Sequence, residues 1–357
     1  MTVNKINDFY KNNFDLARLI AAFLVLFTHG FELLGNLQHE PLYMITNGKL
    51  RCSTIGLYIF FFTSGFLVTK SFLNTNTIGE FIWKRFLRIF PALIMIVLIS
   101  VFIIGPIFTS LSLRNYFSNF LTYQYLFTTS GIYIRHILPG VFEGNSHYDH
   151  GVNGSLWSIS LELKLYFLLI LFGTLKKKGV KGIFTYLLFA CMLFLILLYF
   201  NLWDIQSYFS FLHFSLFILF WLGSFCCINY NKIILNPLIL LALGMIWLIC
   251  IYYLEPLRIF FELAFFIYLT LFCCYTKKTI SLNIDLSYGF YIYAFPITQI
   301  VIEVIGKKEA AILISVVIII ASIVSYGSWK LIEKKFLGMK KNYTWSSVKP
   351  EIISSSN

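Results

Sequence analysis

The stretch from residue 13 to residue 34, NFDLARLIAAFLVLFTHGFELL, can cross a bilayer as a single helix, because about 20 apolar residues suffice. It nevertheless carries Arg18 near its start and His29 near its end. On a helix these two residues return to within roughly 20° of one face and lie about 16 Å apart. Ionisable groups inside a membrane are costly and usually mark a pathway or a functional site. The alternatives are that Arg18 only extends to the membrane surface and that His29 only packs.

The composition of the whole chain is that of a membrane protein. Of its 357 residues, 59% are apolar and 12% are charged, against about 25% charged in ordinary soluble domains. We therefore predict an all-α protein, a polytopic transmembrane helical bundle. The net charge of +12 lies in short clusters between apolar runs, which indicates membrane topology and not a nucleic-acid partner. Six of the seven cysteines fall in apolar runs, so no disulfide framework is expected.

The apolar runs predict about ten spans. They are 15–34, 54–72, 89–109, 155–173, 183–201, 208–228, 237–254, 257–275, 284–305 and 310–332. The aromatic segment 115–128 is too short to cross comfortably, so we place it in the interface or as a re-entrant segment. Residues 1–14 form the N-terminus, 15–335 the ten-span domain, and 336–357 a basic and polar tail.

The distribution of positive charge predicts the orientation. With the N-terminus inside, the inner loops, ends and adjoining span ends hold 19 Lys and Arg, against 7 on the outer side. Cytoplasmic loops carry the excess of Lys and Arg, so both termini are expected in the cytoplasm, with an even number of crossings. No cleavable signal peptide is expected, and no inverted repeat of the transporter kind is visible.

Glu162 is a carboxylate within the fourth predicted span. Counted from the outer ends of their spans, Glu162 lies about 10 Å deep and His29 about 7 Å deep, so the two can share a depth. A carboxylate beside an imidazole orients it and raises its basicity, as in general-base pairs. The pattern predicts His29 and Glu162 as a catalytic pair. The alternative is a structural ion pair of Glu162, perhaps with Lys164.

Basic residues gather before the third predicted span. Lys84, Arg85 and Arg88 are expected in a loop, and Pro91 suits the first turn of the span. Arg85 and Arg88 are spaced to face one way at the start of a helix. Arginine binds phosphate bidentately, so they could meet a phosphate-rich cofactor from the cytoplasm. Lipid anchoring or a simple topology signal would explain the same cluster.

Two further groups of polar residues carry weaker implications. The ninth predicted span combines Pro296 and Gly289 with several tyrosines, a pattern that periodicity alone assigns to packing. The loop sequence NSHYDHG holds His147, Asp149 and His150, which would bind a metal only in a fixed geometry. We therefore expect no metal site.

Taken in order, several stretches resemble the signatures of the membrane acyltransferase type 3 family. They are Arg18-x10-His29, FFFTSGFLV at 60–68, KRFLRIFP at 84–91, LPGVFEGN at 138–145, VNGSLW at 152–157 with Glu162 and Tyr166, SYGFYIYAFPITQ at 287–299 and SWKLIEKKF at 328–336. The resemblance covers nearly the whole chain. Members often read Glu-Lys-Pro where this chain has Glu333-Lys334-Lys335, and many carry an added C-terminal hydrolase-like domain that is not seen in this sequence.

The resemblance implies an acyl-CoA-dependent O-acyltransferase, in the first place an O-acetyltransferase. It would move an acyl group from cytoplasmic acetyl-CoA, or another acyl-CoA, to a hydroxyl of an extracytoplasmic carbohydrate such as capsule, exopolysaccharide or lipopolysaccharide. The protein would lie in the inner (plasma) membrane of a bacterium as a multi-pass protein. Its partners would be the donor, the acceptor, the lipid bilayer and polysaccharide assembly proteins, with no metal and no nucleic acid.

The resemblance also implies roles for individual residues. Donor binding or acyl positioning falls to Arg18, Arg85 and Arg88. His29 would be the base or a transient acyl carrier, supported by Glu162. The residues implied to line the acceptor side are Trp157, Tyr166, Asn153, Ser287 and Tyr288.

Two other classes of protein share these features. A transporter or flippase for a glycan or small solute would also have ten spans and charges inside the membrane, but the missing inverted repeat and the His–Glu pair disfavour it. A structural subunit of a polysaccharide assembly complex is the third class. Neighbouring genes for sugar nucleotides and glycosyltransferases would favour acyl transfer.

Overall fold

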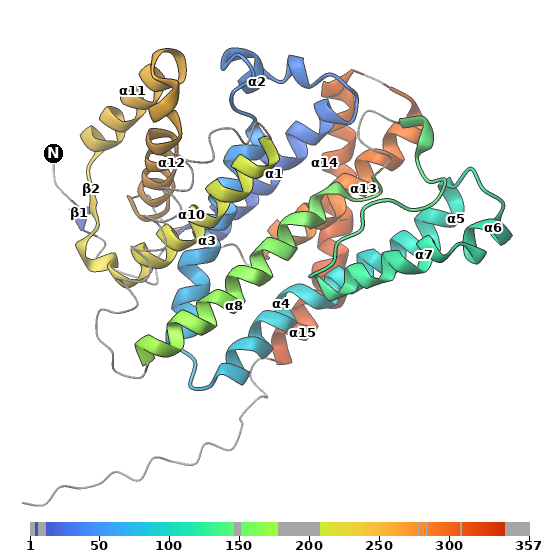
Figure 1. Cartoon of the computed structure of the whole chain (residues 1–357), viewed down its shortest axis with the longest axis horizontal. Helices are drawn as coiled ribbons and strands as arrows, with labels where there is room; N and C mark the ends of the chain where they lie inside the picture. Colours follow the sequence, from blue (N-terminus) through green and yellow to red (C-terminus); the bar gives the residue numbers. More distant parts are fainter. Residues whose placement is uncertain are drawn as a thin grey trace, which may run out of the picture.

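The structure is a computed structural model that describes residues 4–5, 12–145, 151–177, 208–276, 279–280, 282, 284–307 and 309–339. Within these ranges seven helical segments are long and apolar enough to cross a membrane (Figure 1). They are Phe14–Glu32, Cys52–Leu73, Ile78–Phe108, Gly154–Thr174, Leu257–Tyr275, Ser287–Ile305 and Ala310–Gly338. The prediction of a helical, multi-pass membrane protein is confirmed.

The secondary structure elements have the following bounds. The long helices are α1 (Phe14–Glu32), α3 (Cys52–Leu73), α4 (Ile78–Ile99), α8 (Trp157–Lys177), α10 (Tyr208–Ile228), α11 (Pro237–Tyr253), α12 (Glu255–Thr276), α13 (Ser287–Ile305) and α14 (Ala310–Ser328). The short helices are α2 (Pro41–Ile45), α5 (Gly105–Phe108), α6 (Leu113–Ser118), α7 (Phe120–Gln124) and α15 (Lys334–Gly338). Two-residue strands, β1 (Asn4–Lys5) and β2 (Ile234–Leu235), pair antiparallel.

Nine of the predicted spans coincide with a long helix. Two of these helices, α10 and α11, are apolar but short of the length of a full span where their residues are described, at Leu212–Ile228 and Pro237–Tyr253. The predicted span 183–201, the loop with His147, Asp149 and His150, and the tail from residue 340 lie outside the described residues. Ten crossings and cytoplasmic termini therefore stay predictions.

The third predicted span starts earlier than expected. Helix α4 begins at Ile78, so Arg85 and Arg88 lie inside the helix and not in a loop, and Pro91 lies in its interior. The reason is the sequence Thr77-x-x-Glu80, in which the Thr77 hydroxyl caps the helix by accepting from the Glu80 amide at 3.1 Å. A search for apolar runs overlooks such a polar start.

Helix α3 lies at the centre and packs against α1, α8, α10 and α12. Glycines allow the closest of these approaches: a Cβ on Gly65 would stand 1.9 Å from the carbonyl oxygen of Phe220, and one on Gly223 would stand 2.1 Å from that of Phe62. Small residues commonly let transmembrane helices approach this closely. The Thr69 hydroxyl donates to Ser224 Oγ across the same contact at 2.8 Å.

Residues 115–128 do not form one crossing helix. They fall in α6, α7 and a 3₁₀ turn, Tyr125–Ser130, beside the far end of α4 (Figure 1). There α4 widens into a π-helical turn, Ser100–Ile104, and the buried Tyr116 hydroxyl donates to the Val101 carbonyl at 2.9 Å. A π-turn leaves carbonyls without their usual α-helical partners, and Tyr116 satisfies one of them.

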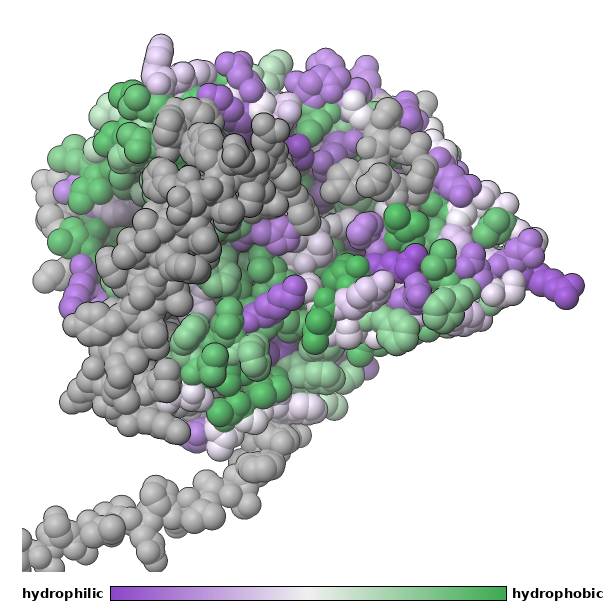
Figure 2. Space-filling view, viewed as in Figure 1, coloured by the Kyte–Doolittle hydropathy of each residue, from purple (hydrophilic) through white to green (hydrophobic). Residues whose placement is uncertain are grey.

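The visible surface separates by polarity (Figure 2). Hydrophobic residues gather over α11 and over the lower parts of α4 and α8, and hydrophilic residues gather near α2 and at the tip around α6. Exposed apolar residues on α11 include Leu241, Met245, Leu248 and Ile249. Such surface is stable in contact with lipid tails.

Candidate active site

Three cavities follow one another between α1, α3, α8 and α13, and α4 also lines the last of them. The first, here the histidine cavity, has a volume of about 240 Å³ and is lined by His29, Glu32, Arg51, Ser155 and Trp157, among others. The last, here the arginine cavity, has about 200 Å³ and is lined by Arg18, Arg85, Arg88, Glu162 and Tyr166, among others. The middle cavity, about 50 Å³, shares Leu57 and Tyr291 with the first and Arg18, Ser64, Glu162 and Tyr288 with the last.

His29 lies in the last turn of α1 and lines the histidine cavity. Its Nδ1 is 3.2 Å from Oε2 of Glu32, one turn further along the same helix. Its Nε2 is 3.4 Å from Ser155 Oγ. The ring packs edge to face on Phe295 of α13, with centroids 5.0 Å apart. The imidazole is thus held at one nitrogen by a carboxylate and presents the other to the cavity.

Arg51 completes this group from the start of α3. Its Nη1 donates to the second oxygen of Glu32, Oε1, at 2.9 Å. The side chains of Arg51 and Glu32 are 20% and 14% exposed, so the ion pair is largely shielded from solvent. One carboxylate oxygen of Glu32 therefore pairs with the positively charged Arg51. The other pairs with His29, which becomes positively charged when it takes up a proton.

The arginine cavity gathers positive charge at the other end. Arg18 from α1 lines this cavity together with Arg85 and Arg88 from α4, the two residues that the Arg-x-x-Arg spacing predicted to face one way. Arg85 Nη2 donates to Ser71 Oγ of α3 at 3.3 Å. Three arginines and one carboxylate among the lining residues suit an anionic ligand, because a guanidinium binds phosphate or carboxylate oxygens in pairs.

Asp285, just before α13, organises two of these arginines. Its Oδ2 accepts from Arg88 Nη2 at 2.6 Å and lies 3.9 Å from Arg18 Nη1. Its Oδ1 accepts from the Ser287 hydroxyl at 2.6 Å. Burial alone would raise the pKa of Asp285, but Arg88 and Arg18 outweigh it and hold that pKa well below its usual range. The carboxylate is therefore ionised at neutral pH.

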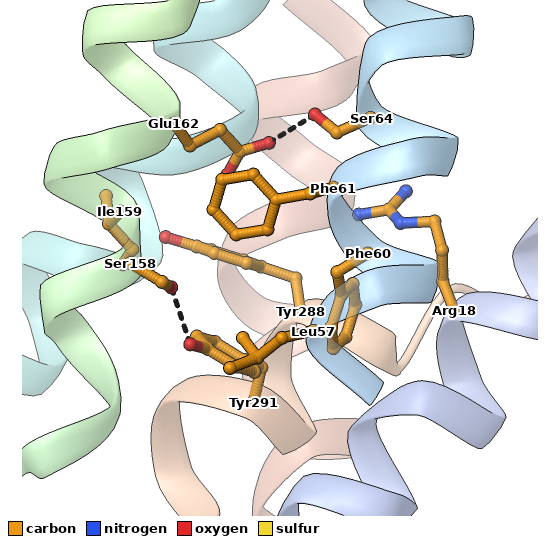
Figure 3. Close-up of a pocket in the computed structure, with 10 residues that line it drawn as sticks. All are labelled: Arg18, Leu57, Phe60, Phe61, Ser64, Ser158, Ile159, Glu162, Tyr288 and Tyr291. Atoms are coloured by element: carbon orange, nitrogen blue, oxygen red, sulfur yellow. Dashed lines mark hydrogen bonds between the residues drawn. The ribbon is translucent and has the colours of Figure 1, made fainter. Parts of the chain in front are cut away.

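Glu162 lines both the arginine cavity and the middle cavity, and Figure 3 shows it in the middle cavity with its carboxylate turned toward Ser64. Its Oε1 accepts from Ser64 Oγ at 2.6 Å and from the Tyr166 hydroxyl at 2.5 Å. At the opposite end of the middle cavity the Tyr291 hydroxyl lies 2.5 Å from Ser158 Oγ, as Figure 3 also shows, and it donates to the Ser155 carbonyl at 2.9 Å. The wall between these polar ends is apolar, formed by Leu57, Phe60, Phe61 and Ile159.

The structure does not bring His29 and Glu162, the predicted catalytic pair, into one cavity. His29 is level with Ser155, before α8 begins, and Glu162 follows seven residues later, about 10 Å along the helix. The depth estimate failed because it took the predicted ends of two different spans as a common membrane surface. The acidic partner of His29 is Glu32, and the partners of Glu162 are Ser64 and Tyr166.

The residues expected to line one acceptor side are divided between the cavities. Trp157 lies in the histidine cavity, whereas Tyr166 and Tyr288 lie in the arginine cavity, since nine residues of α8 separate Trp157 from Tyr166 by about 13 Å. Asn153 is buried and donates to the Ile292 carbonyl at 2.8 Å, and Ser287 donates to Asp285. These last two support α13 and line none of the three cavities.

Glu32, Arg51 and Asp285 received no role from the sequence. Glu32 had a signal, because residues three apart on a helix are neighbours, and it follows His29 by three. Arg51 and Asp285 had none: Asp285 is 197 residues from Arg88 along the chain, and only the packing of α13 beside α4 brings them together.

Comparison with known proteins places the chain among acyltransferases. A family model described as "Acyltransferase domain" (Acyl_transf_3) matches residues 11–327. The chain is 29% identical over 344 residues to a protein of Shigella phage Sf6 named "O-acetyl transferase", covering 91% of this chain and 96% of that protein. It is also 32% identical over 167 residues to "Nodulation protein 10" of Rhizobium leguminosarum bv. viciae, covering 46% of this chain and 44% of that one. No solved structure matches.

Proposed function

The chain belongs to the acyltransferase type 3 family and is a membrane O-acyltransferase, and on this basis we propose that it transfers an acetyl group from acetyl-CoA to a hydroxyl of an extracytoplasmic carbohydrate. The observation that supports this most is the series of three cavities with an imidazole at one end and three arginines at the other. A donor that carries phosphates needs positive charge at its binding site, and an acceptor hydroxyl needs a base. The two ends of the series supply one each. The donor side is the cytoplasm and the acceptor side the exterior.

The arginine cavity binds the donor. Arg85 and Arg88 contact the phosphates of the CoA portion, and Arg18 faces the start of the middle cavity. Arg18 and His29 are eleven residues apart on α1, about 16 Å along the helix. The extended arm of acetyl-CoA runs beside this helix and brings the thioester to His29.

His29 acts on the acceptor in the histidine cavity. Its Nε2 takes the proton of the carbohydrate hydroxyl while the hydroxyl oxygen bonds to the thioester carbonyl carbon. The C–S bond breaks, and the CoA thiolate receives the proton from the imidazolium. Trp157 lines the same cavity and offers an aromatic face to the sugar. A base positioned in this way contributes about 10²–10⁴-fold in rate.

Two measurements test the proposal. Surface glycan from cells with and without the gene is compared by mass analysis; acetyl groups present only with the gene are expected. Purified protein in detergent is then given acetyl-CoA and the deacetylated glycan, and release of the CoA thiol is followed. A glycan of unchanged mass, together with no acceptor-dependent thiol release, would rule out the proposal and leave transport as the better explanation.

A further inference from the structure

His29, Glu32 and Arg51 form a chain of three contacting side chains at the histidine cavity. The imidazole Nδ1 lies 3.2 Å from Glu32 Oε2, and Glu32 Oε1 lies 2.9 Å from Arg51 Nη1. An ionised carboxylate only accepts hydrogen bonds, so the proton between His29 and Glu32 belongs to Nδ1. That tautomer leaves the lone pair of Nε2 facing Ser155 and the cavity.

A second carboxylate, Glu40, fixes the spacing of the two helices that carry this group. Glu40 is fully buried, and its Oε1 accepts from the Thr28 hydroxyl and from the Cys52 amide, both at 2.7 Å. Thr28 precedes His29, and Cys52 follows Arg51. The Thr28 hydroxyl also accepts from the Ser53 amide at 2.8 Å. The end of α1 and the start of α3 are therefore joined one residue away from the histidine and the arginine.

We propose that Glu32, held in place by Arg51, is the positioning residue of His29. This rests on the proposed function, in which His29 Nε2 is the base. Glu32 fixes the imidazole in the tautomer whose Nε2 is unprotonated. It also stabilises the imidazolium that forms when Nε2 takes a proton. Arg51 occupies the other carboxylate oxygen, so the carboxylate cannot rotate away from the ring.

Glu32 is suited to this role and Glu162 is not. Glu32 is the one carboxylate among the described residues that line the histidine cavity, and Glu162 lines the other two cavities. The charged groups that face the imidazole are Glu32 on its own helix and Arg51 at the start of α3, with Glu40 behind them on the loop between the two helices. The pair Glu32–Arg51 carries no net charge, which suits a cavity for a neutral hydroxyl.

The first test needs neither donor nor acceptor. Detergent-solubilised protein is treated with diethyl pyrocarbonate, which reacts at an unprotonated imidazole nitrogen, at a pH high enough that the ring is unprotonated in every variant, so that the rate reports the reactivity of Nε2 alone. The modification rate of His29 is followed by peptide mass spectrometry. Glu32→Gln removes the charge and keeps the shape, so the rate at His29 should fall several-fold. Glu32→Asp keeps the charge and should recover part of the rate. Arg51→Gln should lower the rate and Arg51→Lys should restore part of it.

The matched control is Glu262→Gln. Glu262 is also buried, and it also accepts from an arginine, Arg258, at 2.9 Å and from the Tyr58 hydroxyl at 2.9 Å, but it does not line the histidine cavity. Its loss should lower the melting temperature without changing the reactivity of His29. A melting curve for every variant separates misfolding from loss of positioning, and the arginine variants carry the test if Glu32→Gln does not insert.

Turnover measurements complete the test. In Glu32→Gln the kcat for acetyl transfer should fall about 10- to 100-fold, a share of the ~10²–10⁴-fold that a positioned base supplies, while KM for the acceptor stays nearly unchanged. Wild-type reactivity of His29 in both Glu32→Gln and Arg51→Gln would overturn the proposal, as would an unchanged kcat. If the wild type transfers no acetyl group, the proposed function fails, whereas the reactivity data still decide whether Glu32 positions the ring.

Discussion

Arg88 Nη2 lies 2.6 Å from Asp285 Oδ2, which joins the third turn of α4 to the residues just before α13. The Tyr288 hydroxyl reinforces this junction by donating to the Ile89 carbonyl at 2.8 Å, one residue after Arg88. Arg88 is thereby held with its guanidinium against the arginine cavity. The contact has consequences for stability and for donor binding.

The Arg88–Asp285 pair should make stability depend on pH in acid. The pKa of Asp285 is depressed in the folded protein, so its stabilising effect is complete above the unfolded value of about 3.9 and is lost as pH falls toward the folded value. Asp285→Asn should cost about 3 kcal/mol or more at neutral pH, as for a broken buried pair. Melting temperatures of both proteins, measured in detergent from pH 7 downward, should differ most above pH ~4 and converge below it. A constant difference over the whole range would show that the charge is not the cause.

Removal of Arg85 should weaken use of the donor. Arg85 lines the arginine cavity, and a hydrogen bond to a charged group contributes about 1.5–3 kcal/mol, or roughly 10- to 100-fold in apparent KM for acetyl-CoA. Arg85→Lys keeps the charge without the fork and should fall between wild type and Arg85→Ala. Steady-state kinetics with varied acetyl-CoA measure this. Lys84→Ala is the control, because Lys84 pairs with Glu80 at 2.6 Å and lines none of the three cavities. Equal effects of the two alanine variants would argue against the donor site.

Much of the fold follows from the apolar runs in the sequence. A span of about 20 apolar residues allows one regular structure that satisfies its own backbone, so the positions of α1, α3, α13 and α14 could be predicted. The start of α4 could not be predicted in this way, since the capping residue Thr77 is polar and the first turns of the helix carry basic residues. Capping signals and apolar runs have to be considered together at such a boundary.

The site was predictable residue by residue but not as an arrangement. A charged or imidazole side chain inside an apolar run is costly, and this alone indicated Arg18, His29 and Glu162. Their grouping depends on how far each helix is shifted along its neighbours, which no local pattern encodes. His29 therefore lies beside Glu32 and level with Ser155, and Glu162 lies in a different cavity.

The close packing of α3 on α10 predicts a strong effect of a single methyl group. A Cβ on Gly65 would stand 1.9 Å from the Phe220 carbonyl oxygen, and backbone atoms cannot move aside cheaply. Gly65→Ala should lower the free energy of unfolding by about 1–3 kcal/mol or more. The measurement is the melting temperature in detergent, which should fall. Gly79→Ala is the control, because no atom lies within 4 Å of a Cβ there. A melting temperature unchanged by Gly65→Ala would mean that the two helices are further apart than this packing requires.

The orientation of the bundle predicts which loops are accessible from each side. Asn115 in α6 and Asn76 before α4 are both exposed, and the positive-inside count puts the first outside and the second in the cytoplasm. In intact cells a membrane-impermeant maleimide should label Asn115→Cys. It should label Asn76→Cys only after the membrane is opened, with the wild type as background. The reverse pattern would place the arginine cavity on the outside and contradict cytoplasmic acetyl-CoA as the donor.

The separation of His29 from Glu162 predicts how their mutations combine. Residues that act as one unit are not additive, so His29→Ala with Glu32→Gln should be no slower than His29→Ala alone, which itself should lose about 10²–10⁴-fold. Glu162 holds Ser64 and Tyr166 in another cavity, so Glu162→Gln should lower acetyl transfer by its own factor whether or not His29 is present. Rates of the single and double variants, corrected for the amount of folded protein, measure both couplings. If Glu162→Gln had no further effect in the His29→Ala background while Glu32→Gln did, the catalytic partner of His29 would be Glu162, and the separation of the two cavities would not describe the working enzyme.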